Sequence, residues 1–193
     1  MEKKYRTEPE GDMLRIIALK DFADVKKGDR GGLIEKEENL SQEGNCWIYD
    51  DAYVFEDAFV FGNAKIFDNA QISGKARVFN NAQVYEDAEV CGRAFVYENA
   101  RILGHTRICG VAWVCRTAKI CSNVKLWTTK GFYLDNITTS IKDSKDYIIL
   151  GTKGEFRIFP SNIKNLIDKE ISIVEKNYIK NIKIIRQLYG NEI

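Results

Sequence analysis

The feature that most constrains the fold of this chain is a six-residue period that runs from residue 46 to residue 127. An aliphatic residue recurs at every sixth position, and a small residue, usually alanine, stands two positions before it. Glycine, asparagine and aspartate, which tolerate tight turns, fill many of the positions between. A fixed short period of this kind indicates a repeat architecture. The aliphatic residues occupy positions 48, 54, 60, 66, 72, 78, 84, 90, 96, 102, 108, 114, 120 and 126, and the alanines occupy positions 52, 58, 64, 70, 76, 82, 88, 94, 100, 112 and 118.

The array resembles the hexapeptide-repeat family, and the resemblance implies a left-handed parallel β-helix with triangular coils. Three hexapeptides then make one 18-residue coil, the aliphatic residue points inward, and coils stack at about 4.8 Å. The array covers 82 residues. We therefore expect a mainly β fold: a left-handed parallel β-helix of about four to five coils, with an N-terminal β cap and a small C-terminal α+β tail.

The flanking segments lack the six-residue period. Residues 1–45 are expected to form a hairpin cap with LRIIAL and LIEKEE as strands, because an open solenoid end exposes unpaired backbone. Residues 128–193 are expected to form short strands around YIILGTKGEFRIF and then a helix over 161–189. The chain is thus divided into 1–45, 46–127 and 128–193.

Composition excludes several classes of protein. The 29 basic and 28 acidic residues nearly cancel, which argues against a general nucleic-acid binder. No apolar run approaches the length of a membrane span, and the N-terminus has no signal-peptide core, so a cytoplasmic location is expected. Five cysteines are an odd number, and we expect no disulfide framework. A single histidine excludes sites that need two, and neither a metal nor a cofactor is expected.

The 18-residue coil sorts the outward residues onto three faces, one of which is mostly aromatic. Soluble proteins rarely expose so much contiguous apolar surface, so we expect another element to cover it. Hexapeptide proteins commonly form homotrimers, which makes a homo-oligomer interface one interpretation. The C-terminal helix lying across the face is the other. The proposed interface residues are Phe59, Phe61, Phe79, Phe95, Tyr97 and Trp113.

Charge is polarised along the array, with eight acids against three bases in 46–90 and six bases against one acid in 91–127. Coil spacing stacks like charges, which repel, and a bound anion would offset that cost. Alternatively, the cations extend into solvent or meet acids from the flanking segments. The candidate ligand-binding residues are Arg101, His105, Arg107, Lys119, Lys125 and Trp127.

Two other clusters contain side chains of the types that ligate metal ions. Asp50, Asp68 and Glu86 also stack at intervals of 18 residues, and a solvated ladder of turn residues is favoured over a divalent-cation site. Cys91 and Cys109 stack on one face, but the cysteines do not converge as zinc ligands do.

Three functions remain open. The leading hypothesis is a non-catalytic homo-oligomer that sequesters a phosphate-bearing small molecule, with a nucleotide immune signal favoured. The layout is similar to that of hexapeptide-repeat proteins encoded by bacteriophages, which implies action against host defence in the host cytoplasm. The family is best known for acyltransferases that use coenzyme A or acyl carrier protein, and His105 would be the general base in that alternative. No acid lies close to His105 in sequence to orient it, however. The third possibility is an inhibitor or scaffold that binds a host protein.

Overall fold

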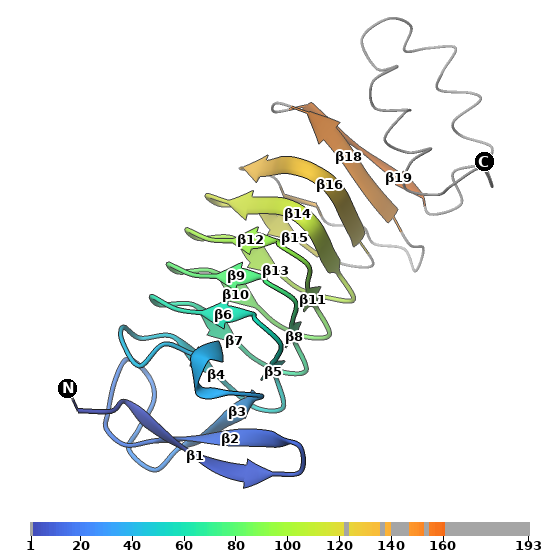
Figure 1. Ribbon diagram of the computed structural model, residues 1–193. Helices are drawn as coiled ribbons and strands as arrows, with labels where there is room; N and C mark the ends of the chain where they lie inside the picture. The colour runs from blue at the N-terminus through green and yellow to red at the C-terminus, as the bar shows by residue number, and fades with distance from the viewer. Residues whose placement is uncertain (1, 122–123, 136–137, 140–146, 153–154, 161–193) are drawn as a thin grey trace, which may run out of the picture.

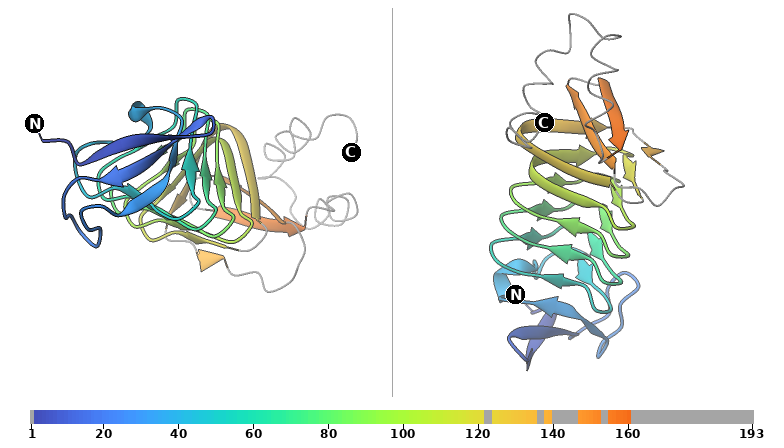
Figure 2. Two further views of the ribbon diagram at one scale, coloured as in Figure 1. Left: turned by 90° about the horizontal axis from the view of Figure 1, so that it is seen from below. Right: turned by 90° about the vertical axis from the view of Figure 1, so that its right-hand side faces the viewer.

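The computed structural model describes the backbone of residues 2–121, 124–135, 138–139, 147–152 and 155–160, and the side chains of residues 2–121 (Figure 1). The expected mainly β solenoid is confirmed, because short strands stack coil upon coil along one axis (Figures 1 and 2). Within the described residues the one helix is a short 3-10 turn, η1 (Glu37–Asn39).

Parallel pairing between residues 18 positions apart builds three faces, as the pairs Gln83–Arg101 and Phe95–Trp113 show. The aromatic face comprises β6 (Phe59–Val60), β9 (Arg77–Val78), β12 (Phe95–Val96) and the second half of β14 (Arg107–Cys115). The β4–β17 face comprises β4 (Trp47–Ile48), β7 (Lys65–Ile66), β10 (Gln83–Val84), β13 (Arg101–Ile102), β15 (Lys119–Ile120) and β17 (Thr138–Thr139). The β3–β16 face comprises β3 (Arg30–Ile34), β5 (Tyr53–Val54), β8 (Gln71–Ile72), β11 (Glu89–Val90), the first half of β14 and the first half of β16 (Val124–Asp135).

The core of the prism is the predicted aliphatic column. Every valine or isoleucine of the period from Ile48 to Ile120 is fully buried, and the alanines of the period are at most 1% exposed. Alanine fits because each corner brings backbone close to the core. Thr106 replaces one alanine and is buried as well, and its Oγ1 donates a hydrogen bond to the Leu103 carbonyl at 2.7 Å. A polar side chain is tolerated there because it is satisfied locally.

The corners are built by residues with positive φ. Asp50, Asp68 and Glu86 have φ values of 50°, 57° and 59°, and glycines take the same role at other corners. Gly92 (φ +70°) also lies so close to the next coil that a Cβ would come within 2.7 Å of the Gly110 nitrogen. Glycine is required there by both conformation and space.

The N-terminal segment extends the solenoid's own sheet. β1 (Tyr5–Glu10) and β2 (Met13–Ala18) pair antiparallel, β2 pairs antiparallel with β3, and β3 pairs in parallel with β5. The predicted LRIIAL and LIEKEE strands overlap β2 and β3, whereas β1 was not anticipated. The cap therefore supplies hydrogen-bond partners to the first coil, and the Leu33 amide donates to the Ala52 carbonyl at 2.9 Å.

The six-residue period predicts that a residue directly before an aliphatic position points outward, as Trp47 does before Ile48, but the structure buries Trp47. Trp47 is 1% exposed, with Tyr5 and Phe22 in edge-to-face contact at 6.2 and 5.3 Å. Lys4 is also buried, and its Nζ donates to the Cys46 carbonyl at 2.9 Å. Burial lowers the pKa of Lys4, and contact with Cys46 opposes that shift. The cap thus closes the first coil with both apolar and polar contacts.

The C-terminal end of the described chain departs from strict hexapeptide geometry. A turn is expected at Gly110, yet β14 runs continuously through it and pairs with β16 with a register shift between Gly110 and Ala112. β18 (Tyr147–Thr152) and β19 (Glu155–Pro160) form an antiparallel hairpin where short strands are predicted, and β18 continues the sheet beside β16. The predicted helix over 161–189 lies outside the described residues. No helix among the described residues is long and apolar enough to cross a membrane.

Candidate functional site

His105 stands at the corner between β13 and β14, with 71% of its side chain exposed. Its Nδ1 lies 3.4 Å from Oδ2 of Asp87, on the preceding coil. Oδ1 of Asp87 accepts a hydrogen bond of 3.1 Å from Nδ2 of Asn69, one coil further back. An Nδ1 proton would be directed at a carboxylate that is itself held in place. Nε2 of the imidazole is then the nitrogen that can accept a proton.

Asp87 supplies the orienting acid that the sequence next to His105 lacks. A search for acids close along the chain missed Asp87 because that residue lies 18 positions away. In an 18-residue coil, position i−18 is a direct neighbour across the sheet. The period itself was the signal that could have identified Asp87.

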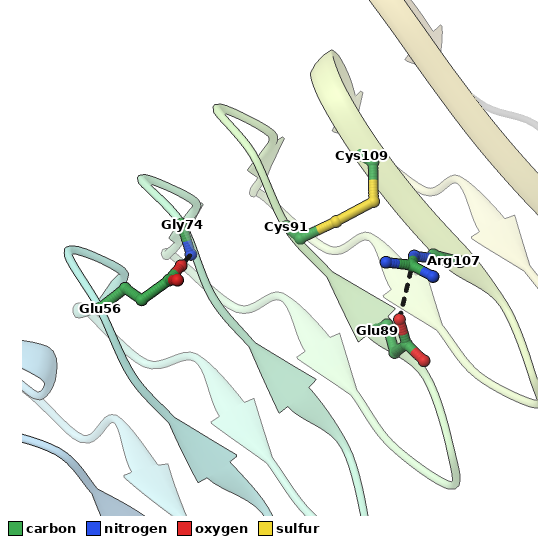
Figure 3. The surroundings of a disulfide bond; sticks show 6 residues. All are labelled: Glu56, Gly74, Glu89, Cys91, Arg107 and Cys109. Atoms are coloured by element: carbon green, nitrogen blue, oxygen red, sulfur yellow. Dashed lines mark hydrogen bonds and ion pairs between the residues drawn. A yellow bond between two sulfur atoms is a disulfide. The ribbon is translucent and has the colours of Figure 1, made fainter.

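Arg107 is paired with an acid of the preceding coil. Its Nε lies 3.0 Å from Oε2 of Glu89, and the side chains are 57% and 38% exposed (Figure 3). The sequence interpretation considered acids of the flanking segments as partners for the basic residues. The partner instead comes from β11, within the array. Arg107 is therefore partly neutralised, although so exposed a pair contributes little to stability.

The other predicted basic residues are placed by strand register. Arg101 and Lys119 are Cα partners in β13 and β15, and Arg107 and Lys125 are partners in β14 and β16. Arg101 is exposed, and no carboxylate of residues 2–121 lies within ion-pair distance of it. Trp127 pairs with Cys109 through the backbone, and the side chains of Lys125 and Trp127 lie outside the described residues. Stacking of the two basic pairs is thus as predicted.

A disulfide joins Cys91 to Cys109, beside the Glu89–Arg107 pair (Figure 3). The expectation that the cysteines would form no disulfide was wrong. The physical reason is that coil stacking places the two Cα atoms 4.7 Å apart, within the range that a disulfide spans. The stacking itself was predicted, but the odd number of cysteines outweighed it. Cys46, Cys115 and Cys121 are not part of a disulfide.

The acidic corner of Asp50, Asp68 and Glu86 forms a ladder of hydrogen bonds. Oδ2 of Asp50 accepts from the Asp68 amide at 3.2 Å, and Oδ2 of Asp68 accepts from the Glu86 amide at 2.9 Å. These carboxylates satisfy turn amides that would otherwise face solvent, as the favoured interpretation holds. In the described part of the chain, no group of three or more histidine, cysteine, aspartate or glutamate side chains is arranged to hold a metal ion.

The aromatic face carries stacked rings. Phe61 stacks on Phe79 with centroids 4.7 Å apart, Phe79 stacks on Tyr97 at 5.1 Å, and Phe95 contacts Trp113 at 5.0 Å. The corner that holds His105 joins the other two faces. In a triangular coil that corner lies opposite the aromatic face. The aromatic residues of this face and His105 of the same chain are therefore separated by the core.

Comparison with known proteins finds two partial matches. The family model described as "YdcK Beta solenoid repeat" matches residues 70–86. The chain is also similar to the "Uncharacterized acetyltransferase YdcK" of Escherichia coli (strain K12), with 61% identity over 36 residues. That alignment covers 19% of this chain and 11% of the relative, so the chain spans about a tenth of the relative's length. Together with the β-solenoid fold, these matches support the resemblance to the hexapeptide-repeat family. The residues of the family match include neither Asp87 nor His105.

Proposed function

We propose that this hexapeptide-repeat protein transfers an acyl group from a phosphate-bearing thioester carrier to a hydroxyl or amine, with His105 as the general base. The observation that carries this proposal is the 3.4 Å approach of His105 Nδ1 to Asp87 Oδ2. Asn69 in turn fixes the Asp87 carboxylate. A base oriented by a third group is the arrangement that activates weak nucleophiles. The printed name of the relative also includes the word acetyltransferase.

The mechanism assigns one role to each residue. Nε2 of His105 removes the proton from the acceptor as the acceptor attacks the thioester carbonyl. The tetrahedral intermediate then collapses, the carbon–sulfur bond breaks, and the imidazolium returns the proton to the leaving thiolate. Asp87 stabilises the imidazolium through Nδ1, as the acid of a catalytic triad does. Arg101 and Lys119, adjacent on the β4–β17 face, would bind phosphates of the carrier.

A second copy of the chain would complete the acceptor site. His105 is exposed, and its corner is a turn within the repeat rather than an inserted loop. The aromatic face of the same chain lies on the opposite side of the prism, so it cannot line this site. In a homotrimer, the assembly that the family resemblance favours, a neighbouring copy would cover the corner. Aromatic residues of the later coils, such as Phe79, Tyr97 and Trp113, would then form the subunit interface.

The second candidate function is capture of a phosphate-bearing small molecule without catalysis. Its support is Arg101, which is exposed and has no carboxylate partner within residues 2–121. An unpaired guanidinium beside a lysine is suited to a phosphate. A nucleotide signal would be the ligand if the chain is a phage protein that acts against host defence.

One pair of measurements separates these functions. Purified protein is incubated with acetyl-coenzyme A and a panel of amines and alcohols, and release of the free thiol is followed. His105→Ala should abolish release while carrier affinity, measured by calorimetry, changes less than about twofold, because a neutral imidazole adds at most one hydrogen bond. Arg93→Ala, at an exposed corner of the same array, is the control and should leave both unchanged.

The opposite pattern would favour capture without catalysis. In that case no acceptor releases thiol, a nucleotide binds, and Arg101→Ala weakens nucleotide binding by about tenfold or more while His105→Ala does not. Thiol release that survives His105→Ala would refute the acyl-transfer mechanism.

A further inference from the structure

A shallow depression lies near the cap, away from the His105 corner. It has a volume of about 770 Å³ and lies where η1 of the cap meets the first coils of the aromatic face. Three of its lining residues are cationic, namely Lys36, Lys75 and Arg77. The remaining charges in its lining are the carboxylates of Glu38 and Asp57. Cationic side chains thus outnumber acidic ones in this depression. The sequence pattern did not identify it.

Arg77 is held in position by hydrogen bonds from Nη1 to the Asp57 and Ala76 carbonyls and by the Phe59 ring, which leave Nε and Nη2 unused within residues 2–121. Its Nη1 donates to the Asp57 backbone carbonyl at 2.6 Å, and its Cζ lies 5.8 Å from the centre of the Phe59 ring. Within residues 2–121 no carboxylate side chain lies within ion-pair distance of Arg77, and Nε and Nη2 have no hydrogen-bond partner there. Arg77 interrupts a face that is otherwise aromatic, so apolar packing does not account for its presence.

Both lining carboxylates, Glu38 and Asp57, act on Lys36, and Asp57 is engaged by it directly. Asp57 Oδ1 forms an ion pair with Lys36 Nζ at 2.9 Å. The hydrogen bond from Lys36 lowers the pKa of Asp57, and Lys75 and Arg77 add smaller contributions in the same direction. All three cations therefore act on Asp57, but Asp57 neutralises chiefly Lys36. Lys75 and Arg77 are left with positive charge directed at the same space.

We propose that this depression binds the phosphate dianion of a small phosphorylated molecule. The N–H groups on Nε and Nη2 of Arg77, which have no partner within residues 2–121, match two phosphate oxygens in a bidentate arrangement. Lys75 supplies a second charge, and Lys36 closes the rim next to Asp57. The Phe59 contact and the Asp57 carbonyl hold the guanidinium in one orientation, which reduces the entropy lost on binding. This site is distinct from His105 and does not depend on acyl transfer.

The experiment uses the full-length His105→Ala protein, labelled with nitrogen-15, so that its result is independent of the proposed activity. Inorganic phosphate, adenosine monophosphate and adenosine are titrated, with sodium chloride matched for ionic strength. The Nε–Hε resonance of Arg77, assigned by its loss in Arg77→Gln, is the reporter. Phosphate and the nucleotide should shift it, whereas adenosine and chloride should not. A larger affinity for the nucleotide than for phosphate would identify a phosphorylated metabolite rather than free phosphate as the ligand.

Matched variants test whether binding is local. Arg77→Gln and Lys75→Gln should each weaken nucleotide binding by about tenfold, as for loss of a charge-assisted contact. Arg93 occupies the position of Lys75 one coil further along and does not line the depression, so Arg93→Gln should change affinity less than twofold. Arg101→Gln should leave the nucleotide-induced shift of the Arg77 resonance unchanged, which separates this site from the His105 corner. The proposal is overturned if chloride reproduces the phosphate shift, if the nucleotide fails to bind, or if Arg93→Gln weakens binding as much as Lys75→Gln.

Discussion

Cys91 and Cys109 form a disulfide between the same two coils that carry Asp87 and His105. Three links thus join these coils at successive outward positions: the Asp87–His105 contact, the Glu89–Arg107 ion pair and the disulfide. Each link connects residues 18 positions apart. The disulfide covalently restrains the coil spacing that sets the distance between the histidine and its carboxylate.

The disulfide should stabilise the native protein measurably. Closing a loop of 18 residues lowers the entropy of the unfolded chain and contributes about 3 kcal/mol. Cys91→Ser should therefore lower the free energy of unfolding, measured with urea under oxidising conditions, by about 2–4 kcal/mol. Cys121→Ser, which alters a cysteine outside the disulfide, is the control. Equal stability of Cys91→Ser and the unmodified protein under oxidising conditions would show that the bond does not form.

The interior register gives a second prediction, based on two adjacent residues. Val78 is fully buried, whereas Phe79 is half-buried and stacks between Phe61 and Tyr97 on the aromatic face. Val78→Asp places a carboxylate among aliphatic side chains, which costs several kcal/mol, and should unfold the chain. Phe79→Asp should preserve the fold, as circular dichroism would show. Equal tolerance of both substitutions would mean that the assigned register is off by one residue.

The periodic part of this fold could be predicted from sequence and the aperiodic part could not. Val78 and Phe79 are assigned to opposite sides of the wall by the six-residue period alone. The period also implies that residues 18 positions apart are neighbours. It does not predict which side-chain atoms come into contact, so the Asp87–His105 contact could be identified only from the three-dimensional structure. Trp47 was misplaced for a different reason. Its environment is created by Tyr5 and Phe22, whose strand and loop follow no repeat and fold back over the first coil.

An ion pair between the cap and the array should make stability depend on pH. The hydrogen bond from Lys65 Nζ, at 2.7 Å, lowers the pKa of Asp24 below its ordinary value, and the Tyr49 hydroxyl adds a smaller effect. A carboxyl whose folded pKa is depressed stabilises the fold at neutral pH, and that contribution is lost as pH falls through the folded pKa. Asp24→Asn should thus lower the melting temperature at pH 7, and the difference from the unmodified protein should shrink near pH 3. A difference that is constant with pH would contradict this.

Introducing carboxylates on the aromatic face tests whether that face joins copies of the chain. Phe79→Glu combined with Tyr97→Glu introduces two carboxylates into a stacked apolar surface, and burying them in an interface is unfavourable. If that face joins copies of the chain, the double variant should have the mass of a monomer by light scattering, while the unmodified protein has a larger mass. As a control, Gln71→Glu changes charge on the β3–β16 face and should leave the mass unaltered. An unmodified protein that is already monomeric at micromolar concentration would argue against the interface.

A control substitution on the same corner shows whether Asp87 orients His105 or only stabilises the corner. Asp51, Asn69, Asp87 and His105 follow one another at intervals of 18 residues, so Asp51→Asn and Asp87→Asn are equivalent changes on different coils. The side-chain amide that Asp87→Asn introduces could still hydrogen-bond the imidazole, but it carries no charge to stabilise the imidazolium. Asp87→Asn should therefore lower kcat for acyl transfer by about two orders of magnitude or more with little change in KM. Asp51→Asn should leave both constants unchanged. If both variants lost activity equally, the effect would come from the corner's stability, and the carboxylate of Asp87 would have no part in orienting His105.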